Sequence, residues 1–151
     1  MTPEQIVALA SCGESETLEF KLTTATLRQA VATLCAMLNH RGGQVMFGVE
    51  SNRRVVGQKI GDHTIEGIAQ EISRIDPPAY PSIERVPLGD GREVVVVSVY
   101  AGENRPYMYQ GKAYRRVGNT SPALSSAEYN HMLIERLHDE HRWENKPAAG
   151  W

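Results

Sequence analysis

The strongest constraint on the fold is a helical stripe of apolar residues between residues 26 and 40. Apolar side chains recur there three and four positions apart, which places them on one face of an α-helix. The stripe consists of Leu27, Ala30, Val31, Leu34 and Leu38. Gly42 and Gly43 follow, and glycine is the usual residue just beyond a helix C-terminus. Since a helix with one apolar face must cover another element, the segment predicts a layered domain.

Other segments predict further helices. Thr2, Pro3 and Gln5 have the spacing of a capping box with proline at the first helical position, so a helix is expected to begin there. Residues 62–75 carry a second amphipathic pattern, which Asp76-Pro77-Pro78 ends. Ser125 and Glu128 form another capping box, which opens a last helix.

Alternating or continuous apolar residues predict the strands. They cover residues 17–21, 44–49, 83–88, 93–100, 107–110 and 113–117. Gly89-Asp90-Gly91 and Gly111-Lys112 separate the last four into two hairpins. We therefore predict an α+β fold, in which a mixed, largely antiparallel sheet with hairpins packs against about four helices.

The same spacings predict the core and the domain boundary. The expected core residues are Leu18, Phe20, Leu34, Leu38, Val45, Phe47, Ile68, Ile72, Val95, Val97 and Leu133. The length of 151 residues suits a single domain, expected over residues 1–140. The patterns stop after His141, so residues 141–151 are expected to be a tail or a linker to a further domain.

Composition narrows the class of protein. No apolar run approaches the roughly 20 residues of a membrane span, and the N-terminal residues lack the pattern of a secretory signal. Cys12 and Cys35 belong to no paired Cys or Cys/His motif, which argues against a disulfide framework or a structural zinc site. We expect a cytoplasmic protein with no membrane partner. The net charge of −2 gives no overall basic surplus for nucleic acid, so binding would need a local basic patch.

Such a patch is predicted in residues 104–120, which contain no acidic residue. Tyrosines alternate with cations there, a combination that suits base stacking and phosphate contacts. A hairpin with buried tyrosines and solvated arginines is an equally open interpretation. The predicted nucleic-acid-binding residues are Arg105, Lys112, Tyr114, Arg115, Arg116, Asn119 and Thr120.

A second candidate site lies in the acidic stretch before and within the first strand. Glu14 and Glu19 could bind a divalent metal, and Lys21 beside them could meet a phosphate. The simpler interpretation is a solvated strand edge with a Glu19–Lys21 pair. The chain contains neither a GxxxxGK[ST] nor a GxGxxG motif, so an ATPase interpretation has no phosphate loop.

These stretches, in this order, resemble the Schlafen AlbA-2 domain, formerly called the divergent AAA-4 domain. The resemblance covers about residues 10–140. The matching segments are Glu14-Ser15 to Glu19-Phe20-Lys21, Asn39 to Gly48-Val49, Val55-Val56-Gly57 and Tyr114 to Thr120. It implies an α+β fold, nucleic-acid binding and, in some members, metal-dependent RNA cleavage.

In the nucleolytic members two glutamates and an aspartate form the metal site. The glutamates match Glu14 and Glu19, but the position of the aspartate holds Ser51. A hydroxyl is a poorer ligand than a carboxylate for a hard cation, which leaves Glu50 as the candidate third metal ligand. If the chain is a nuclease, we expect Glu14, Glu19 and Lys21 to be its catalytic residues, with magnesium or manganese as the metal. Otherwise no cofactor is expected.

We therefore expect a nucleic-acid-binding domain for DNA or structured RNA, part of a bacterial transcriptional regulator. The incomplete carboxylate triad argues against an enzyme. The alternative is a metal-dependent endoribonuclease of the Schlafen type that acts on tRNA-like RNA. The sequence leaves open the choice between DNA and RNA and the oligomeric state, a homodimer included.

Overall fold

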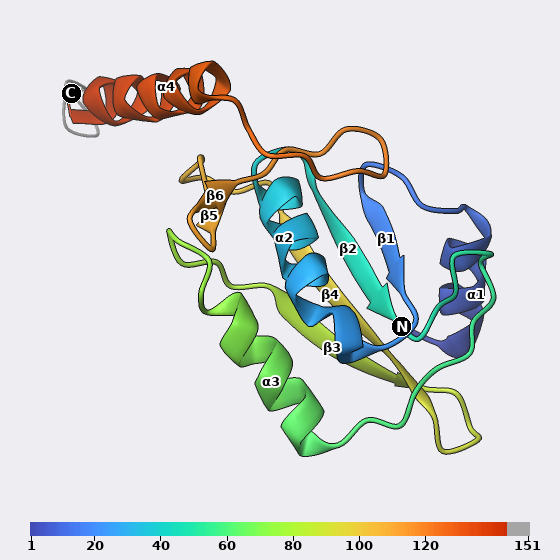
Figure 1. Cartoon of the computed structure of the whole chain (residues 1–151). Coiled ribbons are helices and arrows are strands. Elements are labelled where there is room, and N and C mark those ends of the chain that lie inside the picture. The colour runs from blue at the N-terminus through green and yellow to red at the C-terminus, as the bar shows by residue number, and fades with distance from the viewer. Residues whose placement is uncertain (145–151) are drawn as a thin grey trace, which may run out of the picture.

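The computed structural model describes residues 1–144, and the side chains of residues 1–140. Four α-helices and a short 3₁₀ helix alternate with six strands (Figure 1). The helices are α1 (Pro3–Ser11), the 3₁₀ helix η1 (Thr24–Thr26), α2 (Leu27–Leu38), α3 (Asp62–Ile72) and α4 (Ser126–Glu144). The strands are β1 (Leu18–Lys21), β2 (Gly42–Phe47), β3 (Ser82–Pro87), β4 (Glu93–Tyr100), β5 (Met108–Tyr109) and β6 (Lys112–Ala113).

Four strands form the main sheet in the order β1-β2-β4-β3. The edge strand β1 is parallel to β2, whereas β2 and β3 both run antiparallel to β4. Strands β5 and β6 form a separate two-stranded hairpin. The predicted α+β class with a mixed, largely antiparallel sheet is thereby confirmed.

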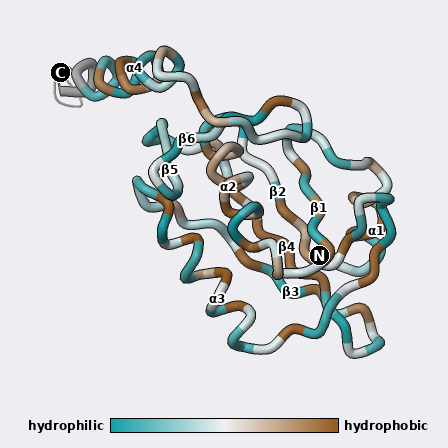
Figure 2. The backbone as a smooth tube through the Cα atoms, in the orientation of Figure 1, coloured by the Kyte–Doolittle hydropathy of each residue, from teal (hydrophilic) through white to brown (hydrophobic). Residues whose placement is uncertain are grey.

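The two faces of the main sheet belong to two apolar clusters. Helices α2 and α3 pack on one face, where Val45, Val95 and Val97 point. Helix α1 packs on the opposite face against Phe20 and Met46. Figure 2 shows hydrophobic stretches of α2, β2 and β4 facing one another in the interior. Alternate residues of β2 and β4 thus serve different layers, as the two-residue period of a strand requires.

Helix α4 departs from the predicted core. It extends away from the body of the domain (Figures 1 and 2), and Ile134 and Leu137 are exposed along it. The expected core residue Leu133 lies on this helix and is only partly buried, so its placement in the main core is wrong. The other ten expected core residues are buried. The amphipathic pattern of α4 correctly predicted a helix. The pattern could not show that no other part of the domain would cover the apolar side of this helix.

Several boundaries differ from the predicted ones. Helix α3 ends at Ile72, although Ile75 is still buried in the turn that follows. The late hairpin pairs only two residues on each strand, because the chain beyond Ala113 turns to bridge with Ala123. Helix α4 extends to Glu144, and residues 145–151 of the expected tail lie outside the described residues. Among the described helices, none is long and apolar enough to cross a bilayer.

Candidate functional site

The acidic residues of the second candidate site lie at and before the edge strand β1. Glu14 lies in the loop that precedes the strand, where its Oε2 accepts a hydrogen bond from the backbone N–H of Phe20 at 3.1 Å. Glu19 and Lys21 lie on the α2 side of β1, opposite its apolar side chains. Lys21 Nζ is 3.9 Å from Glu19 Oε1. The expected Glu19–Lys21 pair is therefore present, but Glu19 is buried rather than solvated.

Arg116 reaches the same place from the other end of the chain. Its guanidinium is 1% exposed, and Nη2 lies 2.8 Å from Glu19 Oε2. The guanidinium also donates to the backbone oxygens of Ser15 at 2.8 Å and Glu16 at 3.3 Å, and to Ser121 Oγ at 3.0 Å. These bonds fasten the loop before β1 to the segment that follows β6. We call Glu14, Glu19, Lys21 and Arg116 the charge cluster.

This position corrects the role expected for Arg116. The sequence grouped it with Arg115 as a phosphate contact. A guanidinium that is buried and already bonded to a carboxylate and two carbonyls has no donors facing solvent for a nucleic-acid backbone. Arg116 therefore leaves the set of expected phosphate contacts and becomes part of the framework of the domain.

The charge cluster changes the acidity of Glu19. Burial favours the neutral carboxyl and raises the pKa of Glu19, and the hydrogen-bonded Glu14 carboxyl raises it further. The Arg116 guanidinium opposes both effects, and the pKa of Glu19 stands at about 7. Near neutral pH Glu19 can therefore carry a proton.

The described residues do not form the carboxylate triad that the resemblance implies. Glu50 lies in the turn after β2, where its N–H donates to the backbone oxygen of Arg54 at 2.9 Å, and Ser51 is exposed. Among the side chains that the structure describes, those of residues 1–140, no group of three or more His, Cys, Asp and Glu could hold a metal ion. One oxygen of Glu19 already faces a guanidinium at 2.8 Å. These residues therefore fit a divalent-ion site poorly, because a hard cation needs several oxygen ligands around it.

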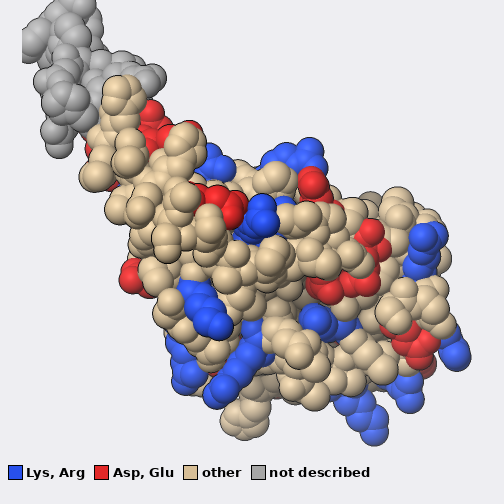
Figure 3. Space-filling view, turned by 45° about the horizontal axis from the view of Figure 1, so that its top comes forward, with Lys and Arg blue, Asp and Glu red and all other residues tan. Residues whose placement is uncertain are grey.

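The other predicted cations are exposed. Arg105 donates to the backbone oxygen of His40 at 3.4 Å, and Lys112 lies in the exposed part of β6. The side chain of Arg115 is 46% exposed and forms an ion pair with Glu128 at 3.3 Å. Figure 3 shows that one face of the molecule carries both signs, with Lys and Arg spread over several parts of it. Three of the four predicted cations are therefore exposed, and their role in binding stays a prediction.

The remaining predicted nucleic-acid contacts have different surroundings. Tyr114 is half-buried and packs against the main core. Asn119 and Thr120 lie in an exposed turn, which the paired backbone bonds between Val117 and Thr120 close at 2.9 and 3.0 Å. Gly118 takes a φ of +55° in this turn, a conformation that suits glycine. Asn119 and Thr120 can thus meet a ligand, whereas Tyr114 is held by the core.

Asn39 has a structural role that the sequence did not reveal. Its amide is buried at the end of α2, where Nδ2 donates to the backbone oxygens of Tyr107 at 3.0 Å and Tyr114 at 2.8 Å. Its Oδ1 accepts from the Tyr107 N–H at 2.7 Å. One side chain thereby anchors the backbone of the 105–115 segment at Tyr107 and at Tyr114. The sequence showed Asn39 as the start of a segment that matches the family and as a polar residue at the end of the apolar stripe, which a solvated helix C-terminus would explain equally well.

Comparison with known proteins places these features in a family. Residues 14–125 match the family model described as Schlafen, AlbA_2. This range contains the charge cluster, the exposed cations and all strands of the main sheet. No curated protein matches the chain.

Solved structures share the fold at low sequence identity. The DIP2311 protein from Corynebacterium diphtheriae is 21% identical with a TM-score of 0.59, and the match covers 88% of this chain and 27% of that chain. The N-terminal domain of a RecG-related protein from Nitrosomonas europaea, provisionally described as an ATP-dependent DNA helicase, is 21% identical with a TM-score of 0.61. That match covers 83% of this chain and 94% of that chain. Because the family model matches most of the chain, over residues 14–125, the chain belongs to the Schlafen AlbA_2 family.

Proposed function

We propose that this domain binds nucleic acid, DNA or structured RNA, as the contact module of a cytoplasmic bacterial regulator. Two findings support the proposal. The chain belongs to the Schlafen AlbA_2 family, for which the resemblance implies nucleic-acid binding, and the name of the Nitrosomonas europaea neighbour includes a DNA helicase. The match covers only 27% of the DIP2311 protein. The role of this domain within a longer regulator is therefore part of the proposal.

The observation that carries the proposal is the acid-free segment of residues 104–120, in which Arg105, Lys112 and Arg115 are exposed. Each of these side chains lies at the surface, and the buried amide of Asn39 fixes the backbone between them. A positioned set of cations can neutralise phosphates without a large basic excess over the whole chain. Sequence-independent affinity for a polyanion is the expected result.

The charge cluster favours binding over cleavage. Metal-assisted hydrolysis needs an ion that orients water and stabilises charge on phosphate oxygens. Glu19 is instead bonded to Arg116, and the third acidic position holds an exposed serine. We therefore propose that Glu14, Glu19 and Lys21 support the fold of this domain rather than a reaction.

A salt titration tests the proposal. The variant Arg105→Gln, Lys112→Gln, Arg115→Gln is compared with the parent on duplex DNA and on a tRNA, by fluorescence anisotropy over a range of salt concentrations. Each lost phosphate contact should lower the slope of log affinity against log salt by about 0.9 on duplex DNA. The triple variant should therefore bind much more weakly at low salt and show a flatter dependence.

The matched control is Arg54→Gln, Lys59→Gln, Arg92→Gln, which removes three exposed cations elsewhere on the domain. Equal losses in both triple variants would show that net charge, and not this segment, determines binding. Each reaction is repeated with manganese and followed on a denaturing gel. Cleavage that Glu14→Gln or Glu19→Gln abolishes would overturn the binding proposal in favour of the nuclease.

A further inference from the structure

A second feature of the surface lies at one end of the main sheet, on the face that α1 covers elsewhere. Gln44 in β2 pairs with Ser98 in β4, which pairs with Ser82 in β3. These three polar residues form a row across the sheet, and Gln44 Nε2 donates to Ser98 Oγ at 3.1 Å. The preceding row on this face contains Met46 and Val96, which α1 buries. Helix α1 therefore stops short of the polar row and leaves it open.

The next row toward the sheet's end carries two tyrosines. Tyr100 follows Ser98 by two residues, and Tyr80 precedes Ser82 by two residues. The antiparallel register that pairs the two serines therefore brings both tyrosines to the same end of β3 and β4. On the neighbouring strand β2, Tyr100 pairs with Gly42, which has no side chain to cover the tyrosine ring. Both tyrosines are 92% exposed, a rare state for a large aromatic side chain.

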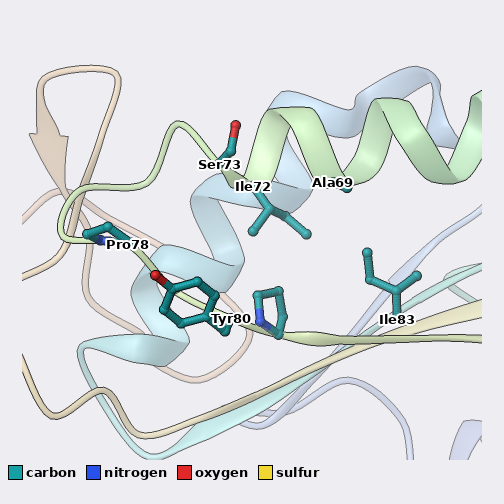
Figure 4. A pocket seen from close by; sticks show the side chains of 8 residues that line it. Ala69, Ile72, Ser73, Pro78, Tyr80 and Ile83 are labelled. Atoms are coloured by element: carbon teal, nitrogen blue, oxygen red, sulfur yellow. The ribbon is translucent and has the colours of Figure 1, made fainter.

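These rows line one hollow of about 590 Å³. Its walls contain Gln44, Ser82, Ser98 and the two tyrosines, and its charged lining residue is Arg41. No carboxylate belongs to the described lining. Tyr80 also borders an apolar hollow of about 330 Å³ beneath α3, where Figure 4 shows it beside Pro78, with Ile72 and Ile83 further along the groove. Tyr80 thus lies on a rim between a polar and an apolar hollow.

Two arginines flank this end of the sheet. The side chain of Arg41 is 66% exposed, although it also pairs with Glu16. Arg105 donates to the backbone oxygen of His40, the residue next to Arg41, so the exposed cations of the 104–120 segment begin beside the hollow. Another hollow, lined by both tyrosines, by Asn104 and by the acidic residue Glu103, connects the tyrosines with the start of that segment. The tyrosines and the start of the cationic segment therefore lie on neighbouring parts of the surface.

We infer that this end of the sheet binds single-stranded nucleic acid, with unpaired bases stacked on Tyr80 and Tyr100. The inference rests on the proposed nucleic-acid function and specifies its ligand class and site. Exposed aromatic rings beside hydrogen-bonding side chains suit bases whose faces and edges are free. A duplex hides its base faces in its own stack, so it cannot use the tyrosines. Gln44 and the two serines can meet base edges, while Arg41 and Arg105 meet phosphates.

Anisotropy with a labelled oligothymidylate and a matched duplex tests the inference on the full chain. Base–aromatic stacking is strong enough that Tyr80→Ala and Tyr100→Ala should each weaken single-strand binding about tenfold. Tyr80→Phe and Tyr100→Phe keep the ring and should bind like the parent. The slope of log affinity against log salt should stay unchanged in the tyrosine variants but fall by about 0.7 in Arg41→Gln, which loses a phosphate contact. Ile134→Ala, another exposed apolar truncation, should have no effect.

The possible results separate this inference from the proposed function. If the parent binds the single strand but both alanine variants bind equally well, the tyrosines are not the site and only this inference fails. Binding of the duplex without binding of the single strand also overturns the inference alone. If the parent binds neither probe nor tRNA, the proposed function fails and the inference fails with it.

Discussion

Arg115 and Arg116 are neighbours in the sequence, yet they belong to two regions with opposite physical character. Arg115 is 46% exposed and pairs with Glu128 on α4, a contact that solvent and salt can screen. Arg116 is buried in the charge cluster, where it bonds to Glu19 and to the backbone of the loop before β1. One arginine is available to a ligand, whereas its neighbour is committed to the fold.

The difference shows that a cationic sequence segment is not automatically a binding surface. An exposed ion pair adds little to stability, because water screens both charges and the side chains lose freedom. Breaking a buried ion pair lowers the free energy of unfolding by more, because water cannot replace the lost bonds. This holds whether the guanidinium or its carboxylate partner is removed. Substitutions at the two positions should therefore act on different properties of the protein.

The largest expected effect comes from Arg116→Met. This change keeps much of the side-chain volume but leaves Glu19 and the carbonyls of Ser15 and Glu16 without their donor. The free energy of unfolding should fall by about 3–5 kcal/mol, as for other broken buried ion pairs. Urea denaturation measured by circular dichroism gives the value.

Arg115→Met is the matched control and should cost less than about 1 kcal/mol. Nucleic-acid binding should respond in the opposite way. Arg115→Met should lose affinity, whereas Arg116→Met, measured under conditions in which it is folded, should bind like the parent. Similar destabilisation by the two variants would remove the distinction between the two regions.

Asn39→Ala tests whether the exposed cations depend on a buried anchor. The variant leaves the backbone groups of Tyr107 and Tyr114 without their amide partner. Leaving buried polar groups unpaired should lower the free energy of unfolding by about 1–3 kcal/mol. Hydrogen exchange should become faster in residues 105–115. In Asn119→Ala, a change in the exposed turn, both measurements should match the parent.

The charge cluster should make stability depend on pH. Burial and Glu14 raise the pKa of Glu19 to about 7, above its ordinary value in the unfolded chain. Between roughly pH 4.5 and 7 the folded state holds more protons at this site, so the contribution of Glu19 to stability falls as pH rises. Urea unfolding in EDTA across this range should show the fall, and Glu19→Gln should remove that part of it. An unchanged pH profile in Glu19→Gln would mean that Glu19 ionises in the folded protein as it does in the unfolded chain.

The smallest expected effect is at Glu128, the partner of the exposed arginine. Glu128→Gln removes the carboxylate that lies 3.3 Å from Arg115 Nη1 and frees this guanidinium for phosphate. Because the pair is exposed, stability should change by less than about 1 kcal/mol. Affinity for nucleic acid should rise slightly and its salt dependence should steepen. A loss of affinity would show that Glu128 orients Arg115 rather than competing with phosphate.

Local patterns in the sequence were sufficient to predict most of the elements and ten of the eleven expected core residues, which the structure divides between two clusters. The apolar stripe of α2 and the valines of β4 form the interior as predicted, since burial of apolar surface dominates the choice of which face turns inward. Glycine turns at residues 89–91 and at Gly111 were enough to locate both hairpins. The motifs also sufficed to indicate the family.

Only the tertiary structure decided which polar groups are buried. Arg116 and Glu19 lie 97 positions apart, and the fold buries both because the loop before β1 and the segment after β6 close over the same strand. Leu133 has a helical apolar pattern like that of Leu34, but α4 extends away from the body, so the same pattern is buried in one place and partly exposed in the other. The register of β3 and β4 likewise brings Tyr80 and Tyr100 to one end of the sheet. A sequence pattern determines which face of an element is apolar, whereas its solvent exposure depends on what the rest of the chain packs against that face.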